Sequence, residues 1–466
     1  MAILGAYVVP HPPVILPEVG KGRESEIRNT SLAYQKVAEE IKALAPDTVV
    51  VISSHMEMYS DYFHIAPGDT VKGSMKEFGT GEVSISIEYD TELRDALCTL
   101  CAECSVPAGT LGAQLKELDH GSLIPLYFLD KAYGEDMPKI IRIGVSGLML
   151  HEHYRVGMLI RQAAEKADRK VVVLASGDLS HRLSEDGPYG YAEEGPIYDA
   201  KVMEALAKPD FEELFAFDEE ELDKAGECGH RCFVMLSGIF DCIGAKADKL
   251  SYEGPFGVGY GIVRFEPLGE QRKAAERSFF DIYSERMSEE MANIRRNEDA
   301  YVSVARLALE NFVKTNSITK LPKDAPDELR EKRAGAFVCI KKQGKLRGCI
   351  GTIEPVMGNV GEEIIMNAMS VAVRDKRFAP VRVDELDYLT YSVDVMCEPE
   401  PVESIDELDV KRYGVIVTSE GKRGVLLPNL EGIDTVEEQL FHARQKAGIK
   451  DNEQILISKF EVERHA

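Results

Sequence analysis

The chain of 466 residues has no apolar run that approaches the roughly 18 residues needed to cross a bilayer, and no basic segment at its start. We therefore expect neither a membrane span nor a signal peptide, and we expect a cytoplasmic protein. Tryptophan is also absent, which excludes no class of function.

Basic residues are fewer than acidic ones, and the cysteines form no regular pattern. The chain has 55 Lys and Arg against 80 Asp and Glu, a net charge of −25. Nucleic-acid binding depends on clustered Lys and Arg, so this charge argues against nucleic acid as a partner. The nine cysteines are scattered and odd in number, which is typical of thiols in a reducing compartment rather than of a disulfide framework. The length predicts two to three domains.

One segment, residues 170–181, organises the first part of the chain. Its sequence is KVVVLASGDLSH. The apolar run at residues 171–175 is rich in β-branched side chains, which predicts a strand buried on both faces. Open α/β sheets bind ligands at the carboxyl ends of their strands, so His181, just beyond this strand, is placed to act on a substrate.

Two further histidines follow predicted strands. The strand at residues 4–9 leads into His11, and the strand at residues 48–52 leads into His55. Each histidine alone could be a hydrogen-bonded side chain at the end of a strand. Neutral imidazole is the commonest metal ligand in proteins, so three such histidines together indicate a metal or catalytic site.

Predicted strands and helices alternate through the first part of the chain. The pattern predicts an α/β domain with a layered, largely parallel sheet flanked by helices. The predicted helices span residues 24–44, 91–103, 121–133, 154–167, 196–207 and 229–243. The additional strands span residues 62–66, 83–87, 139–145 and 257–265.

The alternation ends near residue 266. A highly charged helical stretch at residues 272–297 is either a linker or the first helix of a second domain. We divide the chain into a first domain, residues 1–266, and a second part, residues 267–466. Eight of the ten histidines precede this boundary, so chemistry that needs imidazole is expected in the first domain. The second part mixes helices and strands without regular alternation, which predicts an α+β fold.

The strand-end histidines suggest an iron site. Iron in oxygen-activating enzymes is typically held by two histidines and one carboxylate, which leaves coordination positions open. We assign His11 and His55 as the histidines. Glu227, in the segment GECGH, is our candidate carboxylate because flanking glycines allow a close approach to an ion. A zinc hydrolase could use the same ligands, so the ligands alone do not fix the chemistry.

Five motifs carry a resemblance to a known family. In order they are PHPP at 10–13, SSH at 53–55, DHG at 119–121, SGDLSH at 176–181 and GECG at 226–229. They resemble the motifs of the catalytic B subunit of class III extradiol dioxygenases, a superfamily that includes the Memo-like proteins (AmmeMemoRadiSam system protein B). The resemblance covers about residues 1–266.

The resemblance implies roles for five residues. It implies Fe(II) held by His11, His55 and Glu227, although Memo-like members depart from this set at some ligands. It implies His181 as the acid–base residue and His120 as a residue that contacts substrate. A catechol bound to the cation would be acidified by it, and His181 would take the second phenolic proton and later return it. His120 would hydrogen-bond dioxygen or a substrate oxygen.

Other patterns have plainer explanations. Asp178 is expected to cap a strand end rather than to orient a neighbour. The spacing of Glu227 and His230 matches half of a di-iron helical bundle, but a second such pair is missing and the fold differs. The cysteines at 98, 101 and 104 lack the fourth cysteine of an iron–sulfur segment. We expect a solvated loop at residues 151–153, and no phosphate loop at glycines 257, 259 and 261 because no helix follows them.

The motif LRGCIG at residues 346–351 stands out in the second part. Cys349 beside Arg347 could be a nucleophile with a lowered pKa, but no histidine is near in the sequence, and a buried cysteine between turn glycines is the plainer interpretation. LRGCIG, RDKRFAP at 374–380 and VLLP at 425–428 resemble the AMMECR-type domain (AmmeMemoRadiSam system protein A) over roughly residues 275–466. That resemblance implies a partner more than a reaction, because proteins A and B are usually neighbours of a radical SAM enzyme.

The sequence therefore predicts an iron-dependent enzyme of the extradiol dioxygenase type, joined to an AMMECR-type domain. Its expected reaction is ring opening, or related metal chemistry, on a phenolic or small enol-like substrate. The alternatives are a metal-binding module or scaffold without oxygenase activity that serves a radical SAM partner, and a metal hydrolase. The sequence leaves open whether the chain forms a homo-oligomer.

Overall fold

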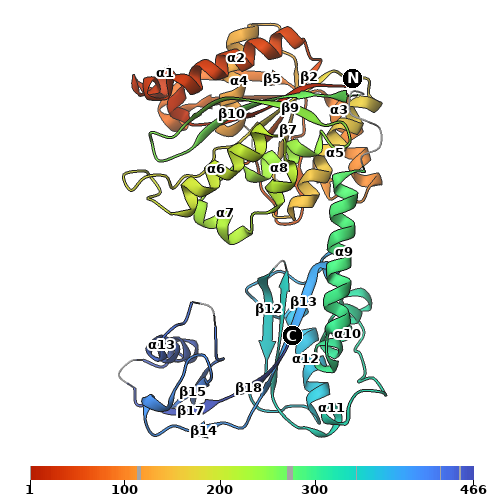
Figure 1. Cartoon of the computed structure of the whole chain (residues 1–466), viewed down its shortest axis with the longest axis vertical. Coiled ribbons are helices and arrows are strands. Elements are labelled where there is room, and N and C mark those ends of the chain that lie inside the picture. Colours follow the sequence, from red (N-terminus) through yellow and green to blue (C-terminus); the bar gives the residue numbers. More distant parts are fainter. Residues whose placement is uncertain (1, 113–116, 270–276, 343, 431, 451–452) are drawn as a thin grey trace. The chain divides into compact units, whose positions relative to one another are not determined.

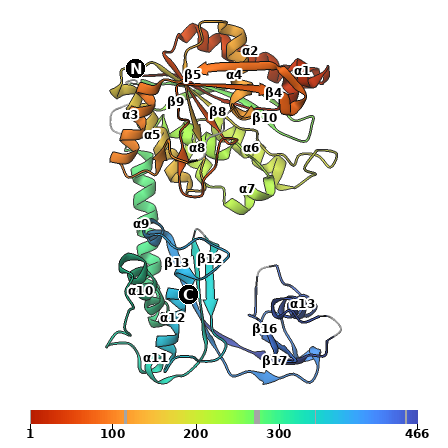
Figure 2. The ribbon, with the colours of Figure 1, turned by 180° about the vertical axis from the view of Figure 1, so that it is seen from behind.

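The computed structural model describes residues 2–112, 117–269, 277–342, 344–430, 432–450 and 453–466 (Figures 1 and 2). It divides into two compact units, Met1–Tyr283 and Ser284–Ala466. The division falls inside α9 (Phe279–Asn297), which belongs to the charged stretch at residues 272–297. Of that stretch, residues 272–276 lie outside the described residues. Among the described helices, none combines the length and the hydrophobicity that a membrane span requires.

A six-stranded sheet forms the centre of the first unit, with the order β7-β2-β8-β1-β10-β9. Its four parallel strands are β7 (Lys139–Gly144), β2 (Thr48–Ser53), β8 (Val171–Ser176) and β1 (Ile3–Val9). Two antiparallel strands complete the sheet, β10 (Tyr260–Pro267) and β9 (Ala245–Glu253). This architecture confirms the predicted layered, largely parallel sheet.

Helices cover both faces of this sheet (Figure 1). Successive side chains of a strand point to opposite faces, so Val173 and Ala175 of β8 enter one core, whereas Val172 and Leu174 enter the other. One face packs against α2 (Arg28–Leu44) and α4 (His120–Tyr133). The other packs against α3 (Thr91–Glu103), α5 (Leu150–Lys166), α6 (Glu194–Ala207) and α8 (His230–Gly238).

The register of the parallel strands positions the predicted site. Val9 of β1 and Ser53 of β2 both pair with Ser176 of β8. The three strands therefore end at the same level of the sheet. The segments that carry His11 and His55 leave the sheet beside the segment that follows Ser176, as the strand-end argument requires.

Several elements of the first unit differ from the prediction. The expected loop at residues 151–153 is wrong, because α5 begins at Leu150 and buries His151 and His153 in the first turns of the helix. The His153 Nδ1 lies 3.1 Å from the Met149 carbonyl oxygen, so this polar side chain is satisfied inside the core. Elements absent from the prediction include the edge strand β9, the short helix α7 (Glu219–Ala225) and the strand β4 (Thr70–Met75), which pairs with β5 (Thr80–Glu88).

The second unit contains two antiparallel sheets and has the predicted α+β character. The first sheet has the order β12-β11-β13-β18, from β12 (Lys345–Gly351), β11 (Ala336–Lys342), β13 (Leu389–Met396) and β18 (Val462–His465). Two helices pack on it, α10 (Ala300–Thr315) and α12 (Val360–Val373). The second sheet comprises β14 (Glu400–Pro401), β17 (Leu456–Phe460), β15 (Gly414–Ser419) and β16 (Lys422–Leu426), and it packs against α13 (Val436–Ala447).

The structure places Cys349 differently from the expectation. It lies on strand β12 rather than between turn glycines, and it forms a disulfide with Cys339 of β11. The expectation of thiols throughout is therefore wrong at this pair. Sequence spacing could not reveal it, because the two cysteines meet only through the register of the β11–β12 hairpin.

Candidate metal centre

His11 is fixed by a chain of hydrogen bonds at the end of β1. It is 2% exposed, and its backbone N–H donates to Asp178 Oδ1 at 2.8 Å. The Ser176 hydroxyl donates to the Gly121 carbonyl at 2.5 Å, so its oxygen is left to accept the His11 Nδ1–H at 3.0 Å. The proton of a neutral His11 ring therefore resides on Nδ1. Its Nε2 carries a lone pair, which is the form in which imidazole binds a metal.

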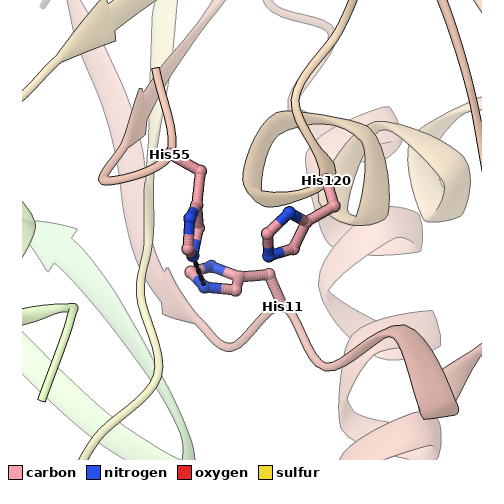
Figure 3. Close-up of side chains that lie close together, drawn as sticks. All are labelled: His11, His55 and His120. Atoms are coloured by element: carbon pink, nitrogen blue, oxygen red, sulfur yellow. Dashed lines mark hydrogen bonds between the residues drawn. The ribbon is translucent and has the colours of Figure 1, made fainter. Parts of the chain in front are cut away.

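The ring nitrogens of His11 and His55 converge (Figure 3). The two Nε2 atoms lie 3.0 Å apart. Two nitrogens that are each about 2.1 Å from one ion, at roughly a right angle, are about 3.0 Å apart, so this spacing suits a shared metal. His120 completes the group, with its ring centroid 4.0 Å from that of His55 and 5.4 Å from that of His11.

The neighbouring acid Asp119 supports this arrangement from the start of α4. Its Oδ1 caps the helix by accepting the Ser122 N–H at 2.8 Å and also lies 2.7 Å from the hydroxyl of Ser53. Its Oδ2 forms an ion pair of 2.9 Å with Arg142, whose side chain is nearly fully buried. Both carboxylate oxygens of Asp119 therefore make structural contacts. It positions His120, which is the first residue of the helix that Asp119 caps.

Two further potential donors lie near His11. Among the described residues, two groups have ligand atoms that all lie within 4.8 Å of one another: His11 with His55 and His120, and His11 with Asp178 and Cys228. The Cys228 Sγ is 3.5 Å from His11 Nε2, and Asp178 Oδ2 is 3.9 Å from the same nitrogen. Both residues were missed as ligands, although Cys228 is adjacent to the predicted Glu227.

Glu227 does not belong to either group. Its Oε2 accepts the backbone N–H of His230, the first residue of α8, so one carboxylate oxygen is used at that helix end. Burial raises the pKa of Glu227 to about 7. His230 is also outside the groups, because its ring lies between the Leu214 carbonyl and the Tyr198 hydroxyl.

Close backbone packing brings these two segments together. A Cβ on Gly177 would lie 2.2 Å from the Gly229 Cα, and a Cβ on Gly229 would lie 2.8 Å from the Asp178 carbonyl oxygen. Neither position therefore has room for a side chain. The two glycines allow the segment after β8 to touch the segment before α8, which places Asp178 and Cys228 beside each other.

Burial keeps the cluster free of positive charge. It lowers the pKa of His11 and of His55, and it lowers the pKa of His120 to about 4. Burial also raises the pKa of Asp178 to about 7, and it raises the pKa of the Cys228 thiol. Imidazole, thiol and carboxyl groups are donor types that transition metals bind.

His181 lies at the edge of the cluster and faces a pocket of about 730 Å³. Its Nε2 is buried, has no hydrogen-bond partner among the described residues, and lies 3.9 Å from Asp178 Oδ2. Burial lowers the pKa of His181 to about 4, so the ring is neutral at pH 7. The same pocket is lined by His11, His55, His120 and Asp178, so the four predicted histidines do come together.

Aromatic and charged side chains form the wall of this pocket. Phe78 packs edge-on against His120, with ring centroids 5.5 Å apart, and Tyr189 stacks on His181 at 5.1 Å. Arg23 also lines the pocket, and its guanidinium lies over Phe256. The pocket can therefore hold a flat ring whose polar edge points to the histidines.

Comparisons with known proteins cover the whole chain. Residues 5–263 match the family model described as the catalytic LigB subunit of aromatic ring-opening dioxygenase, and residues 302–465 match the AMMECR1 family. Protein CA_C1420 of Clostridium acetobutylicum is 40% identical over 476 residues, which cover 100% of this chain and 99% of that protein. A protein of Thermotoga maritima is 48% identical over 170 residues, 36% of this chain and 98% of its own length.

Two solved structures are also similar to parts of the chain. The uncharacterized protein PH0010 from Pyrococcus horikoshii is 34% identical with a TM-score of 0.33, covering 35% of this chain and 88% of that one. The uncharacterized protein JW3007 from Escherichia coli K12 is 17% identical with a TM-score of 0.39, covering 56% of this chain and 99% of that one.

Proposed function

The chain belongs to the family of the catalytic LigB subunit of aromatic ring-opening dioxygenases, and an AMMECR1 domain follows this region in the sequence. We propose that the first unit is an iron-dependent enzyme. Its reaction would be oxygen-dependent ring opening, or related metal chemistry, on a catechol-like or small enolisable substrate. The observation that carries this proposal is the convergence of the His11 and His55 Nε2 atoms, 3.0 Å apart, in a pocket that aromatic side chains also line.

The ion would be held by His11 and His55 together with one further donor. The family resemblance gives Glu227 this position, whereas the ligand atoms of His120 lie within 4.8 Å of those of His11 and His55, and the Cys228 Sγ lies 3.5 Å from His11 Nε2. A bound Fe(II) would act as a Lewis acid on the substrate oxygens and would leave positions open for substrate and dioxygen.

His181 is the residue that would move a proton. Burial lowers its pKa to about 4, so the ring is neutral at pH 7, and it could accept a proton from a substrate hydroxyl that a bound Fe(II) would acidify. Its buried Nε2 has no hydrogen-bond partner among the described residues, and a substrate hydroxyl in the pocket that His181 lines would satisfy that nitrogen. Asp178 lies 3.9 Å from the same nitrogen and can stabilise the imidazolium that forms.

The substrate would lie between the aromatic walls. Phe78 and Tyr189 offer flat surfaces beside His120 and His181. A planar ring inserted there would expel water from the buried nitrogens. The exclusion of water strengthens each polar contact with the reacting oxygens.

An aerobic assay of the Fe(II)-loaded full chain with a panel of catechols tests this proposal. We expect a coloured ring-fission product and matching dioxygen uptake with at least one member, and loss of both in His11→Ala. The variant His442→Ala changes an exposed histidine of the second unit and should behave as the native chain. Iron-loaded protein that neither consumes dioxygen nor forms product with any member would contradict the proposal.

The AMMECR1 domain favours a second candidate function. Its presence in the same chain supports a metal-binding module that serves a radical SAM partner without oxygenase chemistry of its own. The two candidates differ in their need for His181. A His181→Gln chain that keeps its biological activity and its metal would favour the module, and a chain that keeps its metal but loses activity would favour the enzyme.

A further inference from the structure

The second unit contains a pair of cysteines that the proposed metal enzyme does not use. Cys339 of β11 and Cys349 of β12 are directly opposite each other in the antiparallel register, and they form a disulfide. They are 10 residues apart in the sequence, and each is half-buried.

The two cysteines project from the face of the sheet opposite its helices. Val338 and Ile340, the neighbours of Cys339 on β11, are buried in the core that β11 shares with α10 and α12. Because side chains alternate along a strand, Cys339 points to the other face. Cys349, as its register partner, lies on the same face. The sulfur atoms are therefore outside the hydrophobic core.

Charged residues surround the backbone of Cys349. Its N–H donates to Asp375 Oδ2 at 2.9 Å, and its carbonyl accepts from Arg377 at 3.3 Å. Arg377 and Asp375 form an ion pair of 2.7 Å, and the Arg377 side chain is 56% exposed. Cys349 thus has polar neighbours, and both cysteines are partly exposed, so small thiols can reach them.

The disulfide is not what joins the two strands. The backbone ladder already pairs residues 337–342 with residues 345–351, and Val338, Ile340 and Ile350 attach both strands to the core. A bond across an already closed hairpin removes little further freedom from the folded unit. Its formation and cleavage can therefore occur without unfolding.

We propose that Cys339 and Cys349 form a redox-active pair, a thiol–disulfide exchange site that reacts with small dithiols or with glutathione-class thiols. In the reducing direction, a thiolate of the reductant attacks one Sγ and forms a mixed disulfide, and the other Sγ leaves as a thiolate that takes a proton from water. The second thiol of a dithiol, or a second glutathione-class thiol, then attacks the reductant's sulfur in the mixed disulfide and releases the remaining cysteine as a thiolate, which also takes a proton from water. The products are two cysteine thiols and the oxidised reductant, so two electrons and two protons are transferred.

Alkylation of the native full chain in redox buffers tests the proposal. The chain is equilibrated with different ratios of reduced to oxidised dithiothreitol, treated with N-ethylmaleimide, and analysed by peptide mass spectrometry. We expect Cys339 and Cys349 to change from unmodified to fully modified together, over one range of ratios, with no denaturant. The exposed thiol of Cys397 in the same unit should be modified at every ratio.

Variants separate the pair from its surroundings. In Cys339→Ser, the modification of Cys349 should no longer depend on the redox ratio, and Cys349→Ser should have the reciprocal effect on Cys339. Cys397→Ser should leave the transition unchanged. The proposal is overturned if both cysteines are modified even under fully oxidising conditions, if they resist reduction until denaturant is added, or if they respond at different ratios.

Discussion

The close contact between Gly177 and Gly229 predicts that a side chain at either position will weaken metal binding. In Gly177→Ala the new Cβ would lie 2.2 Å from the Gly229 Cα, which is backbone and cannot rotate away. Ordinary contacts begin at 3.4 Å, so the segment after β8 and the segment before α8 must separate by about 1.2 Å. That movement would carry Asp178 away from Cys228 and disturb the donors around His11.

The expected effects of Gly177→Ala are a loss of stability of about 1–3 kcal/mol, as for other overpacked sites, and metal affinity lower by about 10–100-fold, as for disturbed supporting contacts. Urea unfolding measures the first effect, and anaerobic titration with Fe(II) or Co(II) measures the second.

Gly81→Ala is the matched control, because its new Cβ would meet only the Lys76 Cβ at 3.8 Å, an ordinary contact. The reasoning is refuted if Gly177→Ala binds metal as the native chain does, or if Gly81→Ala is equally damaging.

Three other predictions concern single side chains. Burial alone would raise the pKa of Glu385, but hydrogen bonds from Arg347 help to lower it from 4.5 to about 2. Its carboxylate should therefore stabilise the second unit by about 2 kcal/mol above pH 4.5, after allowance for solvent screening. This contribution should be lost as the pH falls toward 2. Urea unfolding of Glu385→Gln and of the native chain at several pH values measures the difference. Cys228→Ser should lower metal affinity more than Glu227→Gln does, because the Cys228 Sγ is 3.5 Å from the His11 ring, as metal titration would show. His181→Gln should lower kcat about 10²–10⁴-fold with unchanged metal content, measured by steady-state kinetics.

A specific result would contradict the role given to each of these three side chains. A constant stability difference between native chain and Glu385→Gln from pH 7 to pH 3 would show that the ion pair with Arg347 does not hold the carboxylate ionised. A greater loss of metal in Glu227→Gln than in Cys228→Ser would give Glu227 the third ligand position. Undiminished kcat in His181→Gln would remove this residue from proton transfer.

Much of the first unit follows from local patterns in the sequence. The run of five apolar residues at 171–175 predicts the strand β8, which the structure buries on both faces, and the predicted helix at residues 91–103 matches α3, Thr91–Glu103. His11 and His55 meet because their strands share a register with Ser176, and the rule for the carboxyl ends of parallel strands anticipates such a meeting.

The details that sequence reasoning missed depend on tertiary contacts. The Cys228 Sγ lies 3.5 Å from His11 Nε2, and the close Gly177–Gly229 contact brings the segments that carry Asp178 and Cys228 together. Neither residue type nor spacing shows this approach of two segments that are remote in the sequence. The Cys339–Cys349 pair likewise depends on strand register, which the spacing of the cysteines does not reveal.

The metal content of the purified chain tests the central claim most directly. The protein is purified without oxygen, loaded with Fe(II), freed of unbound ion, and analysed by elemental mass spectrometry beside His11→Ala, His55→Ala and His442→Ala. We predict one tightly bound ion per native chain and per His442→Ala chain, and almost none in the other two variants. Equal metal in His11→Ala and the native chain would contradict the site.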